Sequence, residues 1–459
     1  MPDLDRLAAE SAALGIALHS VEMTLGGETI LRAACRPAGP DVPHRTYSVS
    51  KTVTGLAVGL LAAEGHVDLD ASVTTWFGEH AAFHPWLEAT TLRDVLAMRG
   101  PHAATTFRPG DPAWLASYFT TTPTHPPGTL FTYDTSGSYA LAALVERVTG
   151  TSLVDYLRPR LLDPLGVSAD VRFLRGPDGY SHGGSGLVCR PHDLLLLARL
   201  VLAGGVHDGV ALLPADFLRD ATSPQVDTAT QTWGTPFRGA YGYQQWLPER
   251  GGFLWFGLGG QIVAGDPRHD LALVVTADTQ ACQNGDQRLV ELVERQLLDP
   301  FVATSGRPAA PSATTSRAPS AELAWPVPGH RAEHAVVVTG RYRASASAGP
   351  ATLDLDLRPD GVVVTSADDG WRLATHPGRA LPGTLGPDAR PCVVAAGWSA
   401  PRTLDVTCWM LDDELATFRL RLHVGADDTV AVRAQGFGEG VDPRWTFVAA
   451  YAAASEVSP

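Results

Sequence analysis

The first 300 residues contain several stretches in which apolar side chains recur at helical spacing. The clearest runs from about Val49 to Glu64, and Gly65 is a typical residue for its C-terminal end. Its apolar positions follow the i, i+3, i+4, i+7, i+8 pattern of one helix face: Val53, Leu56, Ala57, Leu60 and Leu61. Two further helices are predicted at about 139–148 and 193–202, each followed by a glycine.

Strand patterns lie at both ends of this segment. Residues 15–35 predict a hairpin that turns at Gly26-Gly27, and residues 253–298 predict a strand–turn–strand unit followed by a helix. Strands at both ends with helices between them favour one antiparallel sheet closed by both ends of the segment, with a cluster of helices inserted. The fold class expected for this part is therefore α/β, of the α+β type.

After residue 335, polar and apolar residues alternate with a period of two. Leu353, Leu355 and Leu357 alternate with charged residues, and residues 418–434 repeat the pattern after a polar turn. Such alternation predicts antiparallel strands with one face in water, hence a small all-β barrel or sandwich. We find no chemical motif in this part, so we expect a structural or substrate-shaping domain.

A segment of linker composition separates the two patterns. Residues 303–320 contain three prolines and no apolar residue larger than alanine. A chain of 459 residues also exceeds the size, about 250–300 residues, at which a single hydrophobic core stops growing. We expect a first domain at 1–302, a linker at 303–334 and an all-β domain at 335–459.

Composition and charge exclude several classes of protein. Hydrophobic residues at 45% and charged residues at 18% are typical of a globular enzyme, and a net charge of −14 argues against nucleic acid as a partner. No apolar run is long enough to span a membrane, and the N-terminus lacks a signal-peptide pattern, so a cytoplasmic location is expected. The five cysteines form no CxxC pair and the histidines form no metal motif, so neither metal nor cofactor is expected. The oligomeric state stays open.

One residue changes this picture. Of the 35 basic residues, 34 are arginines and only Lys51 is a lysine. Arginine does not lose its proton in proteins, whereas a buried lysine can do so and act as a base. A chain that uses arginine everywhere else and retains one lysine either needs that amine for its chemistry or retains the lysine through neutral genetic drift.

Ser48 stands three residues before Lys51, at the start of the predicted helix. Residues i and i+3 share a helix face, so the hydroxyl and the amine can meet, and the backbone N–H of Ser48 can stabilise an oxyanion. This is the arrangement that a serine nucleophile with an adjacent base requires. The alternative is an N-capping serine beside a solvated lysine.

The sequence around this pair resembles the serine β-lactamase and penicillin-binding-protein superfamily, in particular its class C-like branch of esterases, D-amino peptidases and amide hydrolases. The resemblance starts with TYSVSKTVTGLAVGLLAAEGHVDLDASV and continues in the family's order through TLRDVLAMRG, PPGTLFTYDTSGSYALAALVERVTG, GGSGLVCRPHDLLLLARLVLAGG and FGLGGQIVAGDPRHDLALVVTADTQ. These segments cover most of residues 1–300.

The resemblance implies roles for residues in two further motifs. Tyr133 matches the tyrosine of the family's Tyr-x-Asn motif and is expected to relay protons with Lys51. Thr135 replaces the asparagine, which puts the usual amide contact to the substrate in doubt, and Asp134 is expected to be exposed or to cap the next helix. Other candidates are weaker: Ser185 in GGSG is expected to lie in a loop or to line the pocket.

The family's third motif, usually Lys/His-Thr/Ser-Gly, matches the glycine-rich segment 257–261. The oxyanion hole is expected to combine the N–H groups of Ser48 and Gly260, with Leu258 as second choice to Gly260. The cation with which the family commonly binds a substrate carboxylate is absent. An aromatic group before this motif (Trp233, Tyr241, Tyr243 and Trp246) either lines the substrate or packs in the core. Substrate contacts are expected from Thr135, Gly257, Leu258, Gly259, Gln261 and Tyr243.

The resulting expectation is a β-lactamase-like serine hydrolase that acts on a small or peptide-like ester or amide through an acyl-enzyme. Its catalytic residues would be Ser48, Lys51 and Tyr133. The alternatives are an acyltransferase that passes the acyl group to an amine or alcohol in secondary metabolism, and a non-catalytic member that binds a ligand. True β-lactamase activity is less expected, because the carboxylate-binding cation is missing.

Overall fold

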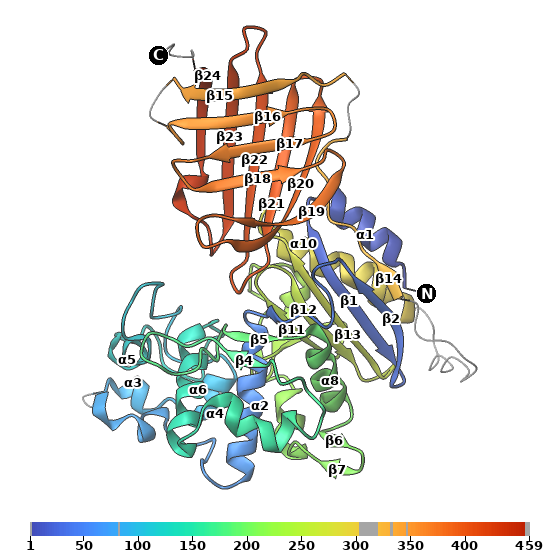
Figure 1. Cartoon of the computed structure of the whole chain (residues 1–459). Coiled ribbons are helices and arrows are strands. Elements are labelled where there is room, and N and C mark those ends of the chain that lie inside the picture. Colours follow the sequence, from blue (N-terminus) through green and yellow to red (C-terminus); the bar gives the residue numbers. More distant parts are fainter. Residues whose placement is uncertain (1, 81–82, 303–319, 331–333, 346–347, 455–459) are drawn as a thin grey trace.

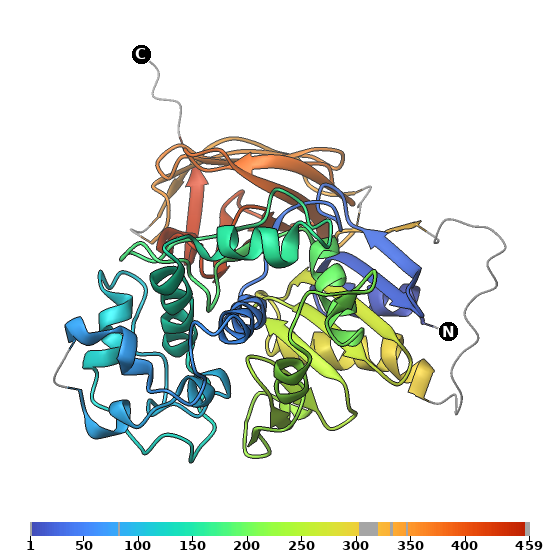
Figure 2. The same ribbon diagram turned by 90° about the horizontal axis from the view of Figure 1, so that it is seen from below.

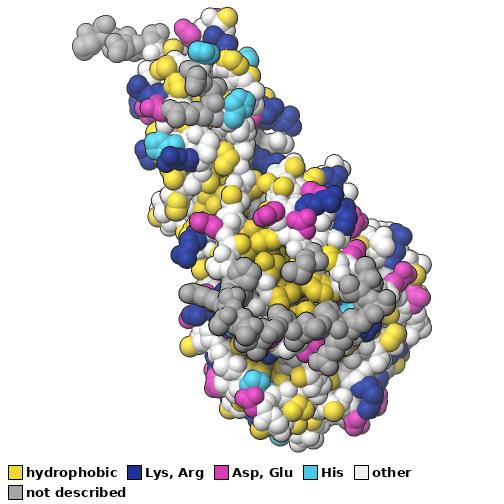
Figure 3. All heavy atoms as spheres, turned by 90° about the vertical axis from the view of Figure 1, so that its right-hand side faces the viewer, with side chains coloured by type: hydrophobic (Ala, Val, Ile, Leu, Met, Phe, Trp, Pro, Cys, Tyr) yellow, Lys and Arg dark blue, Asp and Glu magenta, His cyan; other side chains and the backbone are white. Residues whose placement is uncertain are grey.

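The structure, a computed structural model, describes residues 2–80, 83–302, 320–330, 334–345 and 348–454. A wide N-terminal domain of helices around a sheet carries a β barrel formed by the C-terminal part (Figure 1). On the face shown in Figure 3, basic and acidic side chains are intermixed rather than gathered in patches of one sign. No helix in the described part of the chain is long and apolar enough to cross a membrane.

The N-terminal domain is built on a nine-stranded sheet, and its first and last long strands pair as expected. Strand β1 pairs antiparallel with both β2 and β13, so strands from the start and from the end of the domain lie side by side in the sheet. Its strands, in spatial order, are β14 (Ser320–Glu322), β2 (Glu28–Ala34), β1 (Ala17–Leu25), β13 (Leu271–Asp278), β12 (Gln261–Asp266), β11 (Phe253–Gly257), β10 (Trp246–Pro248), β9 (Gly239–Tyr241) and β8 (Val226–Asp227).

The central strands β1, β12 and β13 are buried on both faces, so their residues do not alternate between buried and exposed. In β13, Val274 packs into a core shared with the helices α2 (Val49–Ala63) and α8 (Pro191–Leu202). Its neighbour Val275 packs into a second core on the opposite face, with α1 (Leu4–Ala13) and α10 (Gly285–Val293).

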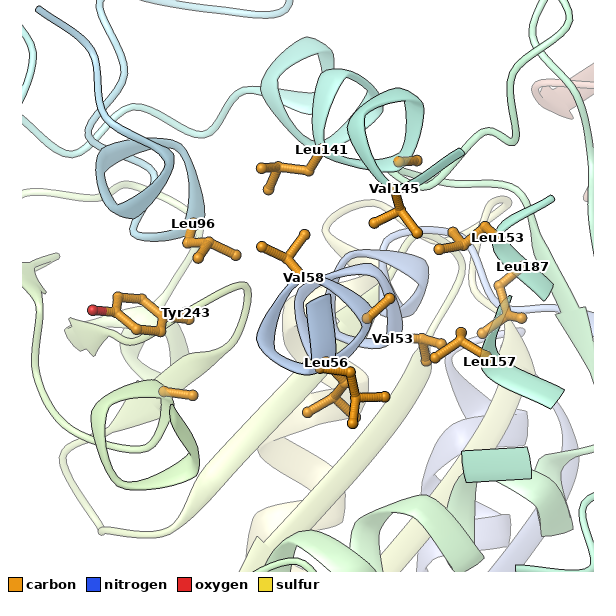
Figure 4. Packing of buried hydrophobic residues seen from close by; sticks show 14 of the residues in the cluster. Val53, Leu56, Val58, Leu96, Leu141, Val145, Leu153, Leu157, Leu187 and Tyr243 are labelled. Carbon is orange, nitrogen blue, oxygen red and sulfur yellow. The ribbon is translucent and has the colours of Figure 1, made fainter. Parts of the chain in front are cut away.

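Helix α2 lies at the centre of the domain, between the sheet and the other helices (Figure 2). Every residue from Val49 to Leu61 is buried, so the prediction of a helix with a single apolar face is wrong. Apolar neighbours surround it on several sides (Figure 4). Close approach depends on small residues: a Cβ at Gly59 would lie 2.5 Å from Phe217, and one at Gly55 would lie 3.1 Å from Gln244.

The helix predicted at 139–148 is longer in the structure. Helix α6 spans Thr135–Thr149, because Asp134 caps its start, and it ends at Gly150 in the left-handed conformation. The other elements of the domain are short: β3 (His44–Arg45), α3 (Pro85–Glu88), α4 (Leu92–Leu96), α5 (Trp114–Thr120), α7 (Leu153–Leu157), β4 (Arg172–Phe173), β5 (Leu187–Cys189), β6 (Val206–His207), β7 (Val210–Ala211), α9 (Ala215–Ala221) and α11 (Asp299–Val302).

The C-terminal domain is a nearly closed antiparallel barrel, as the period-two pattern predicted. Side chains that alternate along its strands form a separate hydrophobic interior that includes Leu353, Leu355 and Leu357. Its ten strands, in spatial order, are β18 (Trp371–Thr375), β17 (Val362–Ser366), β16 (Thr352–Leu357), β15 (Val338–Ala344), β24 (Phe447–Ala453), β23 (Val430–Gly438), β22 (Ala416–Val424), β21 (Thr403–Met410), β20 (Arg390–Ala400) and β19 (Arg379–Leu385).

The segment between the domains differs in part from the predicted linker at 303–334. Residues 303–319 and 331–333 lie outside the described residues, but Ser320–Glu322 form β14, which pairs parallel with β2. Trp325 is buried against Trp409 of the barrel, with ring centroids 5.4 Å apart. One hydrophobic core therefore extends from the first domain into the outer face of the barrel.

We predict that Trp409→Ala lowers the free energy of unfolding by about 3–5 kcal/mol, because it opens a cavity in this shared core. Val448→Ala, which changes a 69% exposed side chain of the barrel, is the control and should leave stability nearly unchanged. Denaturant unfolding followed by circular dichroism measures both. Two separate transitions in Trp409→Ala, with the larger domain unaffected, would show that the shared core does not couple the domains.

Candidate active site

The side chains of Ser48 and Lys51 meet at the start of α2. Lys51 Nζ lies 3.0 Å from Ser48 Oγ, in hydrogen-bonding geometry. Ser48 occupies the N-cap position, but its hydroxyl caps no backbone N–H of the helix. The alternative of a helix-capping serine is therefore not what the structure shows, and the hydroxyl is available for other chemistry.

The turn that presents Ser48 is held in an uncommon backbone conformation. Tyr47, the preceding residue, has φ of +47°, which side-chain-bearing residues rarely adopt. The carbonyl of Tyr47 accepts hydrogen bonds from the backbone N–H and the hydroxyl of Ser50. The hydroxyl oxygen of Ser50 in turn accepts the N–H of Leu187, 2.8 Å away, which ties the turn to β5.

Lys51 is buried, which excludes the alternative of a solvated lysine. Only 1% of the residue is exposed, and Nζ donates a hydrogen bond to the carbonyl oxygen of Gly184 at 2.7 Å. Burial lowers the pKa of Lys51 to about 7, since a charged amine is costly away from water, while the nearby carboxylate of Asp134 acts in the opposite direction. A substantial fraction of this amine is therefore neutral near pH 7.

Tyr133 completes a cluster of three side chains. Its ring centroid lies 4.7 Å from Lys51 Nζ, and the ring stacks on Trp246 with a centroid distance of 5.6 Å. Burial raises the pKa of the Tyr133 phenol well above 10, and hydrogen bonding with Ser48 offsets part of this shift. Tyr133 is therefore protonated at neutral pH, beside a lysine that is partly unprotonated.

Asp134 caps α6 from a buried position, rather than being exposed. Its carboxylate accepts the backbone N–H of Ser136 at 2.8 Å and that of Gly137 at 3.2 Å. Burial raises its pKa to about 6, so it is mostly ionised at pH 7. Thr135, which stands where the family has asparagine, donates its own N–H to Thr105 Oγ1 at 3.0 Å.

The glycine-rich segment 257–261 forms the turn between β11 and β12, next to the Ser48 turn. A Cβ at Gly257 would lie 2.2 Å from the carbonyl oxygen of Thr46, so only glycine permits this approach. Asp286 Oδ1 accepts the N–H of Gly259 at 3.1 Å, and the N–H of Gly260 is directed at the same carboxylate. This orientation differs from the expectation that the Gly260 N–H faces the substrate.

Two predicted substrate contacts do not reach the cleft. The side chain of Gln261 is fully buried: its Nε2 donates to the carbonyl of Ala277 at 2.9 Å, and its Oε1 pairs with His44 at 2.9 Å. Tyr243 packs in the core around α2, and its hydroxyl accepts a hydrogen bond from Arg93 (Figure 4). Tyr243 lies in the bend between β9 and β10, and the order of aromatic residues along the chain does not reveal that this bend turns its side chain into the core.

The remaining aromatic residues before the third motif divide between core and surface. Tyr241 and Trp246 are buried in the core behind Tyr133. Trp233 is 37% exposed and meets the Tyr133 ring edge-on at a centroid distance of 4.8 Å. Of this group, Trp233 is the residue placed to contact a ligand at Tyr133.

Sequence reasoning missed two groups that support the site. The carbonyl of Gly184 belongs to GGSG, a segment interpreted only as loop or pocket lining, and no side-chain pattern marks a carbonyl acceptor. Asp286 lies 27 residues beyond Gly259 on α10, and an acidic residue in the first turn of a helix is ordinary. No group of three or more potential metal ligands occurs among the residues that the structure describes.

The chain is similar in sequence to known proteins. Residues 4–283 match the sequence model of the Beta-lactamase family. The 6-aminohexanoate-dimer hydrolase of Paenarthrobacter ureafaciens is 27% identical over 300 residues, which cover 60% of this chain and 74% of that protein.

Several solved structures are similar to this chain in fold. EstCE1, described as a hydrolase with promiscuous acyltransferase activity, has a TM-score of 0.53 at 16% identity and covers 63% of this chain and 97% of its own. SurE has a TM-score of 0.52 at 18% identity over 87% of this chain and 96% of its own, so that likeness includes much of the barrel.

The single lysine allows the ionisation of the site to be measured directly. With lysine labelled by ¹³C at Cε, nuclear magnetic resonance should show one lysine signal whose titration midpoint lies near pH 7. Asp134→Asn should move the midpoint to lower pH, because it removes the negative charge that favours the ammonium form while an N-capping side chain is retained.

Asp193→Asn is the matched control for this titration. Asp193 is a buried carboxylate near the start of α8, where it accepts the N–H of Arg190 at 3.0 Å. Its replacement should leave the Lys51 midpoint unchanged. A Lys51 midpoint near 10.5 in the unmodified protein would contradict the burial argument.

Proposed function

We propose, because the chain belongs to the Beta-lactamase family, that it is a serine hydrolase that cleaves an ester or amide through an acyl-enzyme on Ser48. The observation that carries the proposal is the 3.0 Å contact between Ser48 Oγ and the buried amine of Lys51. A neutral amine in hydrogen-bond reach of a hydroxyl is the arrangement that activates a serine. The name of the relative, 6-aminohexanoate-dimer hydrolase, supports a hydrolase reaction.

In the first step, neutral Lys51 accepts the proton of Ser48 Oγ as the oxygen attacks the carbonyl carbon of the substrate. The carbon–oxygen double bond opens, and a tetrahedral intermediate forms with negative charge on the former carbonyl oxygen. Lys51 is then an ammonium ion, stabilised by its hydrogen bond to the carbonyl of Gly184 and by the charge of Asp134.

The oxyanion hole combines the backbone N–H groups of Ser48 and Leu258. Gly259 donates to Asp286 and the N–H of Gly260 is directed at the same carboxylate, whereas the N–H of Leu258 has no partner among the described residues. The close approach of Gly257 to the carbonyl of Thr46, two residues before Ser48, supports the choice of Leu258. Donors fixed in advance at this position stabilise the charge as it develops.

In the second step, the intermediate collapses and the bond to the leaving group breaks. Tyr133 donates its phenolic proton to the leaving oxygen or nitrogen and is reprotonated by the ammonium of Lys51. Water then attacks the acyl-enzyme and gives a proton to Tyr133, whose own proton passes to neutral Lys51. The second intermediate collapses, Lys51 returns the proton to Ser48 Oγ, and the acid product leaves.

The glycine-rich third motif, 257–261, indicates the charge of the substrate. Gly257 stands where the family commonly has a lysine or histidine, so this turn offers no cation for a substrate carboxylate. The exposed ring of Trp233 beside Tyr133 adds apolar surface on the same side. We therefore propose a neutral, partly apolar ester or amide as substrate, and hydrolysis in the cytoplasm.

Covalent labelling tests the nucleophile. A fluorophosphonate should label the unmodified protein at Ser48, and Ser48→Ala should abolish both labelling and turnover of a short-chain p-nitrophenyl ester. Ser185→Ala, which removes another serine hydroxyl near the site, should retain both. Lys51→Arg keeps the charge but supplies no base, so it should be nearly inactive.

The same assay separates the alternatives. Labelling that survives Ser48→Ala would remove Ser48 from the role, and no turnover by the unmodified protein would favour the ligand-binding alternative. Product that forms only when an amine is added would favour acyl transfer over hydrolysis.

The assignment of Leu258 to the oxyanion hole has its own test. Leu258→Pro removes the N–H and should lower kcat by about 10²–10³-fold, with little change in KM. Leu258→Ala retains the N–H and should stay within a few-fold of the unmodified protein, as steady-state kinetics will show. Equal kinetics for the two variants, with equal melting temperatures, would exclude this N–H from the oxyanion hole.

A further inference from the structure

The outward face of barrel strand β22 docks on the N-terminal domain beside the active site. Along this strand, Ala416, Phe418 and Leu420 point into the barrel interior. Thr417 and Arg419, and Leu415 just before the strand, lie on the opposite face. Each of these three residues bonds to or packs against the catalytic domain.

Leu415 touches both turns that build the site. Its backbone N–H donates a hydrogen bond to the hydroxyl oxygen of Tyr47 at 2.8 Å, next to the nucleophile. Its side chain fills the space over Gly259, where a Cβ would lie 2.0 Å from Leu415 Cδ1. A single barrel residue thus contacts the Ser48 turn and the oxyanion turn.

The Tyr47 conformation explains why such a contact matters. Residues other than glycine at positive φ are strained and persist only where the surroundings hold them. The Tyr47 ring is buried, and the guanidinium of Arg45 lies 4.3 Å from its centroid. Arg45 also donates to the carbonyl of Ser185 at 2.9 Å and to that of Asp413 in the β21–β22 loop at 3.3 Å.

Further contacts fix this loop and strand against the domain. The carboxylate of Asp413 pairs with Arg172 at 2.6 and 2.8 Å. Thr417 Oγ1 donates to the buried carboxylate of Asp278 at 2.7 Å, at the end of β13. Arg419 donates to the carbonyl of Ala281 at 3.0 Å, in the segment that leads to Asp286 and its bonds to the oxyanion turn.

We propose that the barrel is a working part of the active site, in which Leu415 positions the nucleophile turn and the oxyanion turn and Thr417, through Asp278, holds the strand that carries Leu415 against the catalytic domain. The effect expected on kcat rests on the proposed function, whereas the effect expected on the order of the two turns does not. Neither residue needs to touch the substrate. Because a displacement of about 1 Å can cost about 100-fold in rate, the barrel contributes to kcat through geometry.

The test uses the full chain and removes single contacts. Tyr47→Phe deletes the acceptor of the Leu415 N–H, and Thr417→Val deletes the bond to Asp278. Leu415→Ala removes the packing over Gly259, and Leu415→Met restores most of it. The matched controls are Tyr156→Phe, which deletes a tyrosine hydrogen bond to Glu64, and Thr375→Val in the barrel wall.

Two readouts are compared with thermal stability. The first is the rate of fluorophosphonate labelling at Ser48, together with kcat and KM for a p-nitrophenyl ester. The second is hydrogen–deuterium exchange of peptides that cover residues 44–52 and 255–262. We expect Tyr47→Phe, Thr417→Val and Leu415→Ala to lower labelling rate and kcat about 10-fold or more at unchanged KM, and to raise exchange in both peptides.

Leu415→Met should recover most of the activity, and both controls should leave labelling and exchange unchanged. The proposal is overturned if the interface variants label at the unmodified rate and exchange as the controls do, with only a lower melting temperature. Failure of the unmodified protein to be labelled would refute the proposed function instead, and the exchange data would still decide whether the barrel holds the two turns.

Discussion

The burial of one amine is the constraint on which the site depends. Lys51 is the chain's only lysine, and moving a charged ammonium out of water is costly unless the group loses its proton or gains partners. Here it has a carbonyl acceptor at Gly184 and the hydroxyl of Ser48, and its pKa falls to about 7. Arginine could not take this place, because it would stay charged. The site is thus able to hold a neutral base at physiological pH because α2 is enclosed on all sides.

Enclosure of α2 in turn requires distant segments to approach it closely. Glycine at 59 and 257 permits contacts that any Cβ would prevent, and the second of these sets the oxyanion turn against the backbone before Ser48. Asp286 then accepts the amide of Gly259 from α10 and faces that of Gly260. The nucleophile, the base and the oxyanion donors are therefore positioned by packing and by buried hydrogen bonds, rather than by flexible loops.

The sequence predicted the part of this arrangement that is local. The three-residue spacing of Ser48 and Lys51 defines a helix face, and period-two alternation predicts the barrel strands without knowledge of their partners. Tyr133 could be identified only through resemblance to a family, since 82 residues separate it from Lys51. The orientation of the Gly260 N–H toward Asp286 could not be predicted, because the packing of α10 brings that carboxylate close, and Tyr243 was misplaced because the bend between β9 and β10 turns its side chain into the core around α2.

The barrel shows a further limit of pattern reasoning. Thr417 and Arg419 occupy the polar positions of β22, which in isolation predict a face in water, yet both donate hydrogen bonds to the catalytic domain. Alternation separates the inside of a barrel from its outside, but a polar outside is equally compatible with solvent and with a polar domain interface. The apolar contact of Trp325 with Trp409 adds shared hydrophobic burial to these bonds. An interface that combines both types of contact restricts relative motion of the domains, and it lets a strained turn in one domain be maintained by a residue of the other.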